Sequence, residues 1–226
     1  MSSSTSYDRQ LVVALLASED DQSILAQGLA LNDKHRELAL ASEIVTLHCR
    51  PLSGGARHAD GVDALRRALA GQRDVPRVVG GDSRIYLVAS CSAADRTLAS
   101  WPADALANLL AETGLHDVAL ISIVADEAGR DLARSDDAQI EPGAYSFASA
   151  LHDVLWTAHG IRTIVHARTG RVLVVEQAHA RCGTLVEAGR KLTTSNPGNQ
   201  SAQHHAPHSK LRLWWDGEVQ RRDWAY

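Results

Sequence analysis

The chain has 226 residues, of which 45% are hydrophobic and 22% are charged, and its formal net charge is -4. This length and composition are typical of one globular domain, or of one domain with a small appendage. The negative charge argues against a nucleic-acid partner unless basic residues gather locally. No apolar run reaches the length of a membrane span. The three cysteines lack metal-ligand spacing, which favours a reducing compartment over a disulfide framework.

Strands and helices alternate along most of the chain. Runs of β-branched and apolar residues predict buried strands over 11–16, 43–48, 84–92 and 119–127, with further strands over 161–167 and 171–176. Apolar residues at helical spacing predict helices from Ser18 onward and over 62–69, 102–112 and 145–159. This order predicts an α/β fold with a mostly parallel sheet flanked by helices.

The last part of the chain has a different pattern. Residues 211–215 alternate, which predicts a half-exposed strand of a C-terminal antiparallel β-hairpin. Lys210 and Arg212 then share one face of that strand. Trp214, Trp215 and Trp224 also lie in this segment. They either dock a protein partner or close the hairpin onto the sheet.

Polar residues follow two of the predicted buried strands. Ser90 and Cys91 end the strand over 84–92, and Asp126 and Glu127 end the strand over 119–127. The carboxyl ends of parallel strands meet at one edge of an open sheet, where ligands and chemistry are found. We therefore expect these side chains to face one another across a common crevice.

Cys91 admits two interpretations. A nucleophilic cysteine needs a nearby base, usually a histidine, and His48 at the end of another predicted strand is the candidate. A carboxylate such as Asp126 beside the thiol would raise its pKa and suppress its reactivity. The alternative to a nucleophile is a small, partly buried core thiol.

Basic residues gather in the C-terminal part of the chain. Arg190 and Lys191 follow a glycine that can form an anion-binding turn, and Lys210 and Arg212 share a strand face. If the two pairs lie side by side, four cations converge, and they repel one another unless acids or a polyanion neutralise them. The alternative is a solvated basic face.

No metal site is predicted. His204, His205 and His208 lie in a stretch rich in Ser, Asn, Gly and Pro between predicted strands. A transition-metal site needs ligands that the fold holds in place. We therefore expect these histidines to have only weak, adventitious affinity for metal ions.

Four stretches of the chain carry a resemblance. They are Tyr7-Asp8 with 11–16, then 84–91 with 98–107, then 121–126, and finally 187–193 with 209–216. In this order they resemble the inositol-phosphate-activated cysteine protease domains of large bacterial toxins, which have a caspase-like fold. The Ser-rich start predicts a disordered leader over 1–10. The resemblance implies a single caspase-like domain over 11–226, with a β-flap over about 168–226.

The chain departs from this family at the catalytic positions. The family's histidine falls on Ser90, and its cysteine falls on Asp126. A serine cannot act as a general base near neutral pH, and a carboxylate does not replace a thiolate. Cys91 is offset by one residue, and neighbouring residues of a strand point to opposite faces. The resemblance therefore implies a degenerate protease site.

The resemblance also implies a ligand. Basic flap residues of the family bind inositol hexakisphosphate. Arg190, Lys191 and Lys210 fall on comparable positions, and we add Arg84 and Arg212 to the candidate ligand-binding residues. Inositol hexakisphosphate is thus a candidate ligand, with no cofactor required. An apparent insertion over 176–184 leaves the register of the flap open.

The expected function is that of a catalytically inactive module, a bacterial effector that recognises an inositol polyphosphate or a protein partner. The Ser-rich start lacks the features of a secretory signal, so we expect the bacterial cytoplasm or export without a signal peptide. Two alternatives stay open. One is a cysteine hydrolase with a remodelled site built on Cys91. The other is a protein-interaction module that uses the Trp-rich hairpin.

Overall fold

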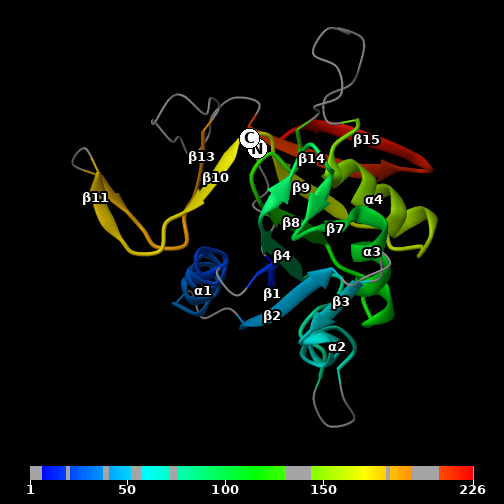
Figure 1. Cartoon of the computed structure of the whole chain (residues 1–226), viewed down its shortest axis with the longest axis horizontal. Helices are drawn as coiled ribbons and strands as arrows, with labels where there is room; N and C mark the ends of the chain where they lie inside the picture. The colour runs from blue at the N-terminus through cyan, green and yellow to red at the C-terminus, as the bar shows by residue number, and fades with distance from the viewer. Residues whose placement is uncertain are drawn as a thin grey trace, which may run out of the picture.

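The computed structural model is organised around one large sheet (Figure 1). It describes residues 7–18, 21–37, 41–51, 57–71, 76–130, 144–181, 184–194 and 209–225. The sheet has eight strands in the order β15-β14-β9-β8-β4-β1-β2-β3. These strands are β1 (Arg9–Leu16), β2 (Ala41–Pro51), β3 (Arg57–Asp60), β4 (Arg84–Ala89), β8 (Leu120–Val124), β9 (Ile164–Arg168), β14 (Lys210–Asp216) and β15 (Val219–Trp224).

The direction of the strands matches the predicted fold class. Strands β2, β1, β4, β8 and β9 run parallel to one another. Strands β3, β14 and β15 are antiparallel additions at the two edges. The prediction of an α/β fold with a mostly parallel sheet and a C-terminal antiparallel hairpin is confirmed.

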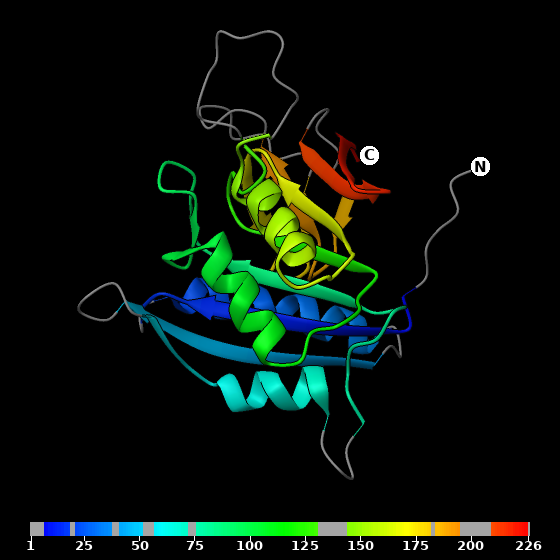
Figure 2. The ribbon, with the colours of Figure 1, turned by 90° about the vertical axis from the view of Figure 1, so that its right-hand side faces the viewer.

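Helices cover both faces of the sheet, because the central strands are apolar on both faces. Helix α1 (Gln22–Glu37) lies on one face, where it packs near Tyr86 and Val88 of β4. On the other face Ile85 and Leu87 join the main core. The helices of that face are α2 (Val62–Ala70), α3 (Ala103–Glu112) and α4 (Phe147–Thr157). Figure 2 shows α3 and α4 on the near face and α1 on the far one.

Four short strands lie beside α1 (Figure 1). We call the segment over 171–194, which contains them, the arm. Its strands are β10 (Arg171–Val174), β11 (His179–Arg181), β12 (Thr184–Val186) and β13 (Lys191–Thr194), paired as β10 with β13 and β11 with β12. Gly189 touches α1 so closely that an added Cβ would lie 2.6 Å from the carbonyl oxygen of Ala30. Its φ of +69° also favours glycine.

A further small sheet follows the end of β4. It consists of β5 (Cys91–Ser92), β6 (Thr97–Leu98) and β7 (Trp101–Pro102), and it leads the chain into α3. None of the helices in the described part of the chain is long and apolar enough to cross a membrane.

Two expectations about the ends of the chain differ from the structure. Strand β1 begins at Arg9, inside the segment 1–10 predicted as a leader, while residues 1–6 lie outside the described ranges. The segment 168–226 predicted as one flap divides into the arm and the hairpin β14–β15, which joins the main sheet beside β9. The apparent insertion over 176–184 extends the arm through β11 and part of β12.

We expect Leu87→Ala to lower the free energy of unfolding by about 2–5 kcal/mol, because it leaves a cavity in a fully buried central strand. Leu87 is 0% exposed, whereas Leu29 of α1 is 43% exposed and provides a matched control. Leu29→Ala should change stability by no more than about 0.5 kcal/mol. Urea unfolding followed by circular dichroism measures both. Equal losses in the two variants would contradict this placement of the core.

Candidate functional site

The predicted crevice at the strand ends exists as a cavity of about 550 Å³, which we call the strand-end pocket. Strands β4 and β8 run in register, with Val88 beside Val124, so the chain leaves both strands at the same edge. Ser90, Cys91 and Asp126 all line the pocket. Glu127, which we expected to face them, is not among the lining residues and pairs with Arg130.

Asp126 has a structural partner in the arm. Its Oδ1 accepts a hydrogen bond of 2.6 Å from the backbone N–H of Val172, and its Oδ2 lies 3.7 Å from Nε of Arg171. Burial raises the pKa of Asp126, and the bond from Val172 and the charge of Arg171 act against this rise. The carboxylate thus fastens the start of β10 to the end of β8.

Cys91 is not set up as a nucleophile. Burial, together with the charges of Asp126 and Glu127, raises the pKa of its thiol to about 12. Among the described residues, no histidine lines the strand-end pocket. His48, the candidate base, lies on β2, which pairs with β1 and β3 and not with β4. The thiol therefore has neither a thiolate population nor a base.

A second group of candidate side chains lies on the α1 face of the sheet. Alternate residues of a strand share a face, so β4 contributes Arg84 and Tyr86, β9 contributes His166 and Arg168, and β14 contributes Lys210 and Arg212. The register places Lys210 directly beside Arg168. We call Arg84, Arg168, Lys191 and Lys210 the basic cluster.

Tyr86 is the platform on which the basic cluster is built. Lys191 of the arm donates a hydrogen bond of 2.7 Å to its hydroxyl, and the Nζ atom lies 3.9 Å from the ring centroid. The Arg84 guanidinium lies 4.6 Å from the same centroid. One buried aromatic ring therefore holds two cations through cation–π contacts.

Neutral groups orient Arg84 from the other side. Its Nη2 donates to Oε1 of Gln10 at 2.8 Å and lies 2.9 Å from Nε2 of His35. Burial, together with the charge of Arg84, lowers the pKa of His35 to about 4, so His35 is neutral near pH 7 and accepts this hydrogen bond.

The cations of the basic cluster are partly removed from water and repel one another. Burial is the largest cause that lowers the pKa values of Arg168, Lys191 and Lys210, and that of Lys210 falls to about 8. Neighbouring cations lower the two lysine pKa values further. Burial and four surrounding cations also lower the pKa of His166, which is uncharged near neutral pH.

Four of the five predicted ligand-binding residues belong to this face: Arg84, Lys191, Lys210 and Arg212. The carbonyl oxygen of Arg190 accepts a hydrogen bond of 2.9 Å from the backbone N–H of Val175. Sequence reasoning missed Arg168, His166 and Tyr86. The alternation of β9 was a usable signal for the first two, but their meeting with Lys210 depends on strand pairing.

Metal binding finds no support in the described part of the chain, where no group of three or more His, Cys, Asp or Glu residues could hold an ion. The histidines His204, His205 and His208 lie outside the described residues.

Comparisons with known proteins give little further guidance. No protein-family model matches the sequence, and no curated protein matches it. Among solved structures, a secreted C11 cysteine protease from Bacteroides thetaiotaomicron, called iotapain, is similar, with 13% identity and a TM-score of 0.38 over 74% of this chain and 53% of that one. A secreted C11 protease from the same organism, bound to an irreversible peptide inhibitor, gives 8% identity and a TM-score of 0.33 over 72% of this chain and 49% of that one. This chain thus spans about half the length of these structures, and such likeness assigns it no activity.

We expect Cys91 to resist alkylation in the folded protein. A rise of its pKa from 9.0 to about 12 lowers the thiolate fraction at pH 8 roughly 1000-fold. Asp126→Asn should speed the reaction, because it removes a neighbouring negative charge. Peptide mass spectrometry after timed iodoacetamide treatment measures the rate, with the denatured chain as the control. Rapid labelling of native Cys91 at pH 7 would contradict this assignment.

We expect the stability of the ligand-free protein to rise with pH through Lys210. The pKa of Lys210 is lowered from 10.5 to about 8 in the folded state. Between these values the unfolded chain binds more protons than the folded one, so the free energy of unfolding increases with pH. Urea unfolding at pH 8 and pH 10 measures the increase.

Lys210→Met should reduce this increase, while Lys34→Met, which keeps both lysines of the basic cluster, should retain it. The same change with pH in wild type and Lys210→Met would contradict the assignment.

Proposed function

We propose that the protein is a catalytically inactive, caspase-like module that binds a polyphosphate anion in the basic cluster, with an inositol polyphosphate as the candidate ligand. One observation carries the proposal. Arg84, Arg168 and Lys210 converge beneath the arm, and none of them forms an ion pair with a carboxylate of the described chain.

The energy of such a cluster favours an anionic ligand. Removing a charged group from water costs several kcal/mol per ion, and like charges add their mutual repulsion. The pKa of Lys210 is lowered to about 8, so this lysine loses its proton more readily, which reduces part of this cost. An anion that carries several negative charges converts the repulsion into attraction and returns each lysine to its charged form.

The position of the cluster favours a ligand that bridges two parts of the fold. Lys191 comes from β13 of the arm, whereas Arg84, Arg168 and Lys210 come from β4, β9 and β14 of the main sheet. A polyanion with phosphates on several sides can contact both. Binding would therefore hold the arm against the sheet, which suits a regulatory or recognition module.

The chemistry of the strand-end pocket supports the inactive part of the proposal. Ser90 and Asp126 occupy the positions where the resembled family has its catalytic histidine and cysteine. Asp126 is engaged with the backbone of Val172, and the Cys91 thiol has a pKa of about 12. A hydrolase built on Cys91 is therefore less favoured than a binding module.

The contacts of the Trp-rich hairpin favour packing within the chain over docking of a protein partner. Trp215 stacks on His152 of α4 with ring centroids 5.0 Å apart, and it also contacts Trp156. Trp224 packs against the main core. These two rings close the hairpin onto the helices of the other face.

We expect inositol hexakisphosphate to raise the melting temperature. A ligand at a hundred times its dissociation constant adds about 2.7 kcal/mol, which is roughly 5–10 °C for a chain of this size. The double variant Arg168→Ala/Lys210→Ala should lose the shift. The loss of the two charges should not lower the stability of this variant, because the cations that are removed repel their neighbours. Differential scanning fluorimetry measures both effects.

Arg221→Ala is the matched control, since Arg221 is an exposed cation of β15 that pairs with Asp216 at 3.3 Å. It should retain the full shift. The absence of a shift in the wild type would refute inositol hexakisphosphate as the ligand, and an equal shift in the double variant would refute its binding in the basic cluster.

A further inference from the structure

A second cavity, with a volume of about 410 Å³, lies where β8 and β9 begin, and Ala119, Ile164 and Trp214 are among its lining residues. We call it the Trp214 cavity. Arg212 lines it and also lowers the pKa of Lys210 and of His166, so this guanidinium lies between the cavity and the basic cluster. The two features are therefore neighbours along β14.

The cavity has an aromatic wall. Trp214 lines it and lies two residues beyond Arg212 on the same face of β14. The Arg212 guanidinium is held 5.1 Å from the centroid of the Trp214 ring. On another side Arg162 lines the cavity and lies 4.0 Å from the ring centroid of Trp156. Rings and guanidinium planes of this kind are the groups on which nucleobases stack.

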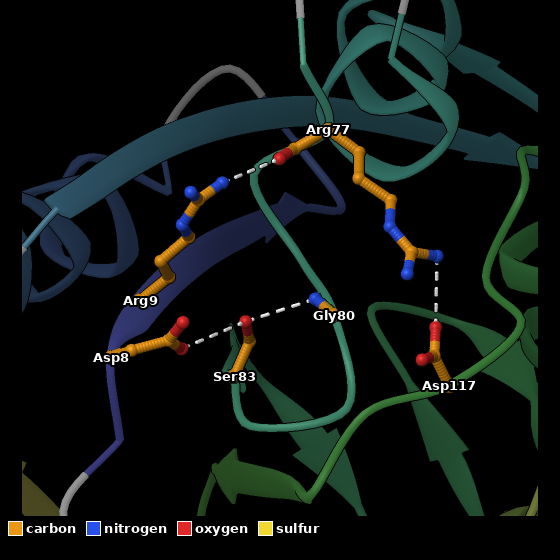
Figure 3. A network of polar contacts seen from close by, with 6 residues as sticks. All are labelled: Asp8, Arg9, Arg77, Gly80, Ser83 and Asp117. Atoms are coloured by element: carbon orange, nitrogen blue, oxygen red, sulfur yellow. Dashed lines mark hydrogen bonds and ion pairs between the residues drawn. The ribbon is translucent and has the colours of Figure 1, made fainter.

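The cavity also has a polar corner. Asp117 lines it, and Nη1 of Arg77 donates a hydrogen bond of 2.9 Å to Oδ1 of that carboxylate. Figure 3 shows this contact beside the turn that carries Gly80 and Ser83, whose hydroxyl accepts a 2.9 Å bond from the Gly80 N–H. A carboxylate oriented in this way accepts hydrogen bonds from ribose hydroxyls or from an exocyclic amine.

The distances along β14 suit a ligand with an aromatic end and an anionic end. Lys210 and Trp214 are four residues apart on one face, which is about 14 Å along a strand. A base, a ribose and a short chain of phosphates can bridge such a span. An inositol polyphosphate has no aromatic group and would leave the Trp214 cavity unused.

We infer that the polyanion is a nucleoside polyphosphate, whose phosphates bind the basic cluster and whose base enters the Trp214 cavity. The inference rests on the proposed polyphosphate site and names its ligand class. Arg212 then contacts the phosphate nearest the ribose, Trp214 stacks with the base, and Asp117 accepts a hydrogen bond from the ribose or the base.

Isothermal titration calorimetry with tripolyphosphate, ATP and GTP in Mg²⁺-free buffer tests the inference. The wild type should bind at least one nucleotide about 10-fold more tightly than tripolyphosphate, because only the nucleotide gains base stacking. Trp214→Leu should remove this advantage, so that the nucleotide and tripolyphosphate bind with similar affinity. Trp214→Phe, which keeps an aromatic ring, should retain most of the advantage.

The outcomes separate the two proposals. Equal affinities for tripolyphosphate and both nucleotides in the wild type would overturn the nucleotide inference and leave the polyphosphate site standing. A nucleotide advantage that survives Trp214→Leu would also overturn the inference, because the base would then lie elsewhere. Failure of all three ligands, together with inositol hexakisphosphate, to bind would refute the polyphosphate site itself.

Discussion

The repulsion between cations that share one face of the sheet is the constraint on which the rest of the site depends. Strand register creates it, since pairing of β9 with β14 sets Arg168 beside Lys210, and a slip of one residue would turn both side chains to the opposite face. The opposite face is filled by the main core beneath α3 and α4, so charges cannot be placed there. The cations therefore lie on the α1 face, where Tyr86 and the arm enclose them. Arg84, Arg168 and Lys210 form no ion pair with a carboxylate of the described chain, so their burial carries a cost that the proposed anionic ligand would offset.

The arm connects this site to the strand-end pocket. Near one end of β10, Asp126 accepts the N–H of Val172, and at the start of β13, Lys191 donates to the hydroxyl of Tyr86. Gly189, which lies between Val172 and Lys191 in the sequence, is in close contact with α1. Groups at the strand ends that would suit catalysis in another protein here hold the arm in place. The Cys91 thiol in this pocket has a raised pKa, and no histidine of the described ranges lines the pocket with it.

Local pattern predicted the sheet and much of the strand-end pocket. Apolar runs without alternation identified the central parallel strands, and the carboxyl-edge rule placed Cys91 and Asp126 in one cavity. Local pattern did not predict the contacts between segments that are far apart in the sequence. Whether Arg190 or Lys191 faces the sheet depends on how the arm pairs, and Arg168 joins the basic cluster only through antiparallel pairing with β14. The hydrogen bond between Asp126 and Val172 likewise joins residues 46 positions apart, which no local pattern reveals.

Proton uptake on ligand binding tests the central claim most directly. If a polyanion completes the basic cluster, it must raise the lowered pKa values of Lys210 and Lys191. Calorimetric titration of inositol hexakisphosphate at pH 8.5, in two buffers of different ionisation enthalpy, counts the protons that accompany binding. The account predicts net uptake by the protein, strongly reduced in the Lys210→Met variant. Binding without proton uptake, or uptake that is unchanged in that variant, would contradict a polyanion site built on the basic cluster.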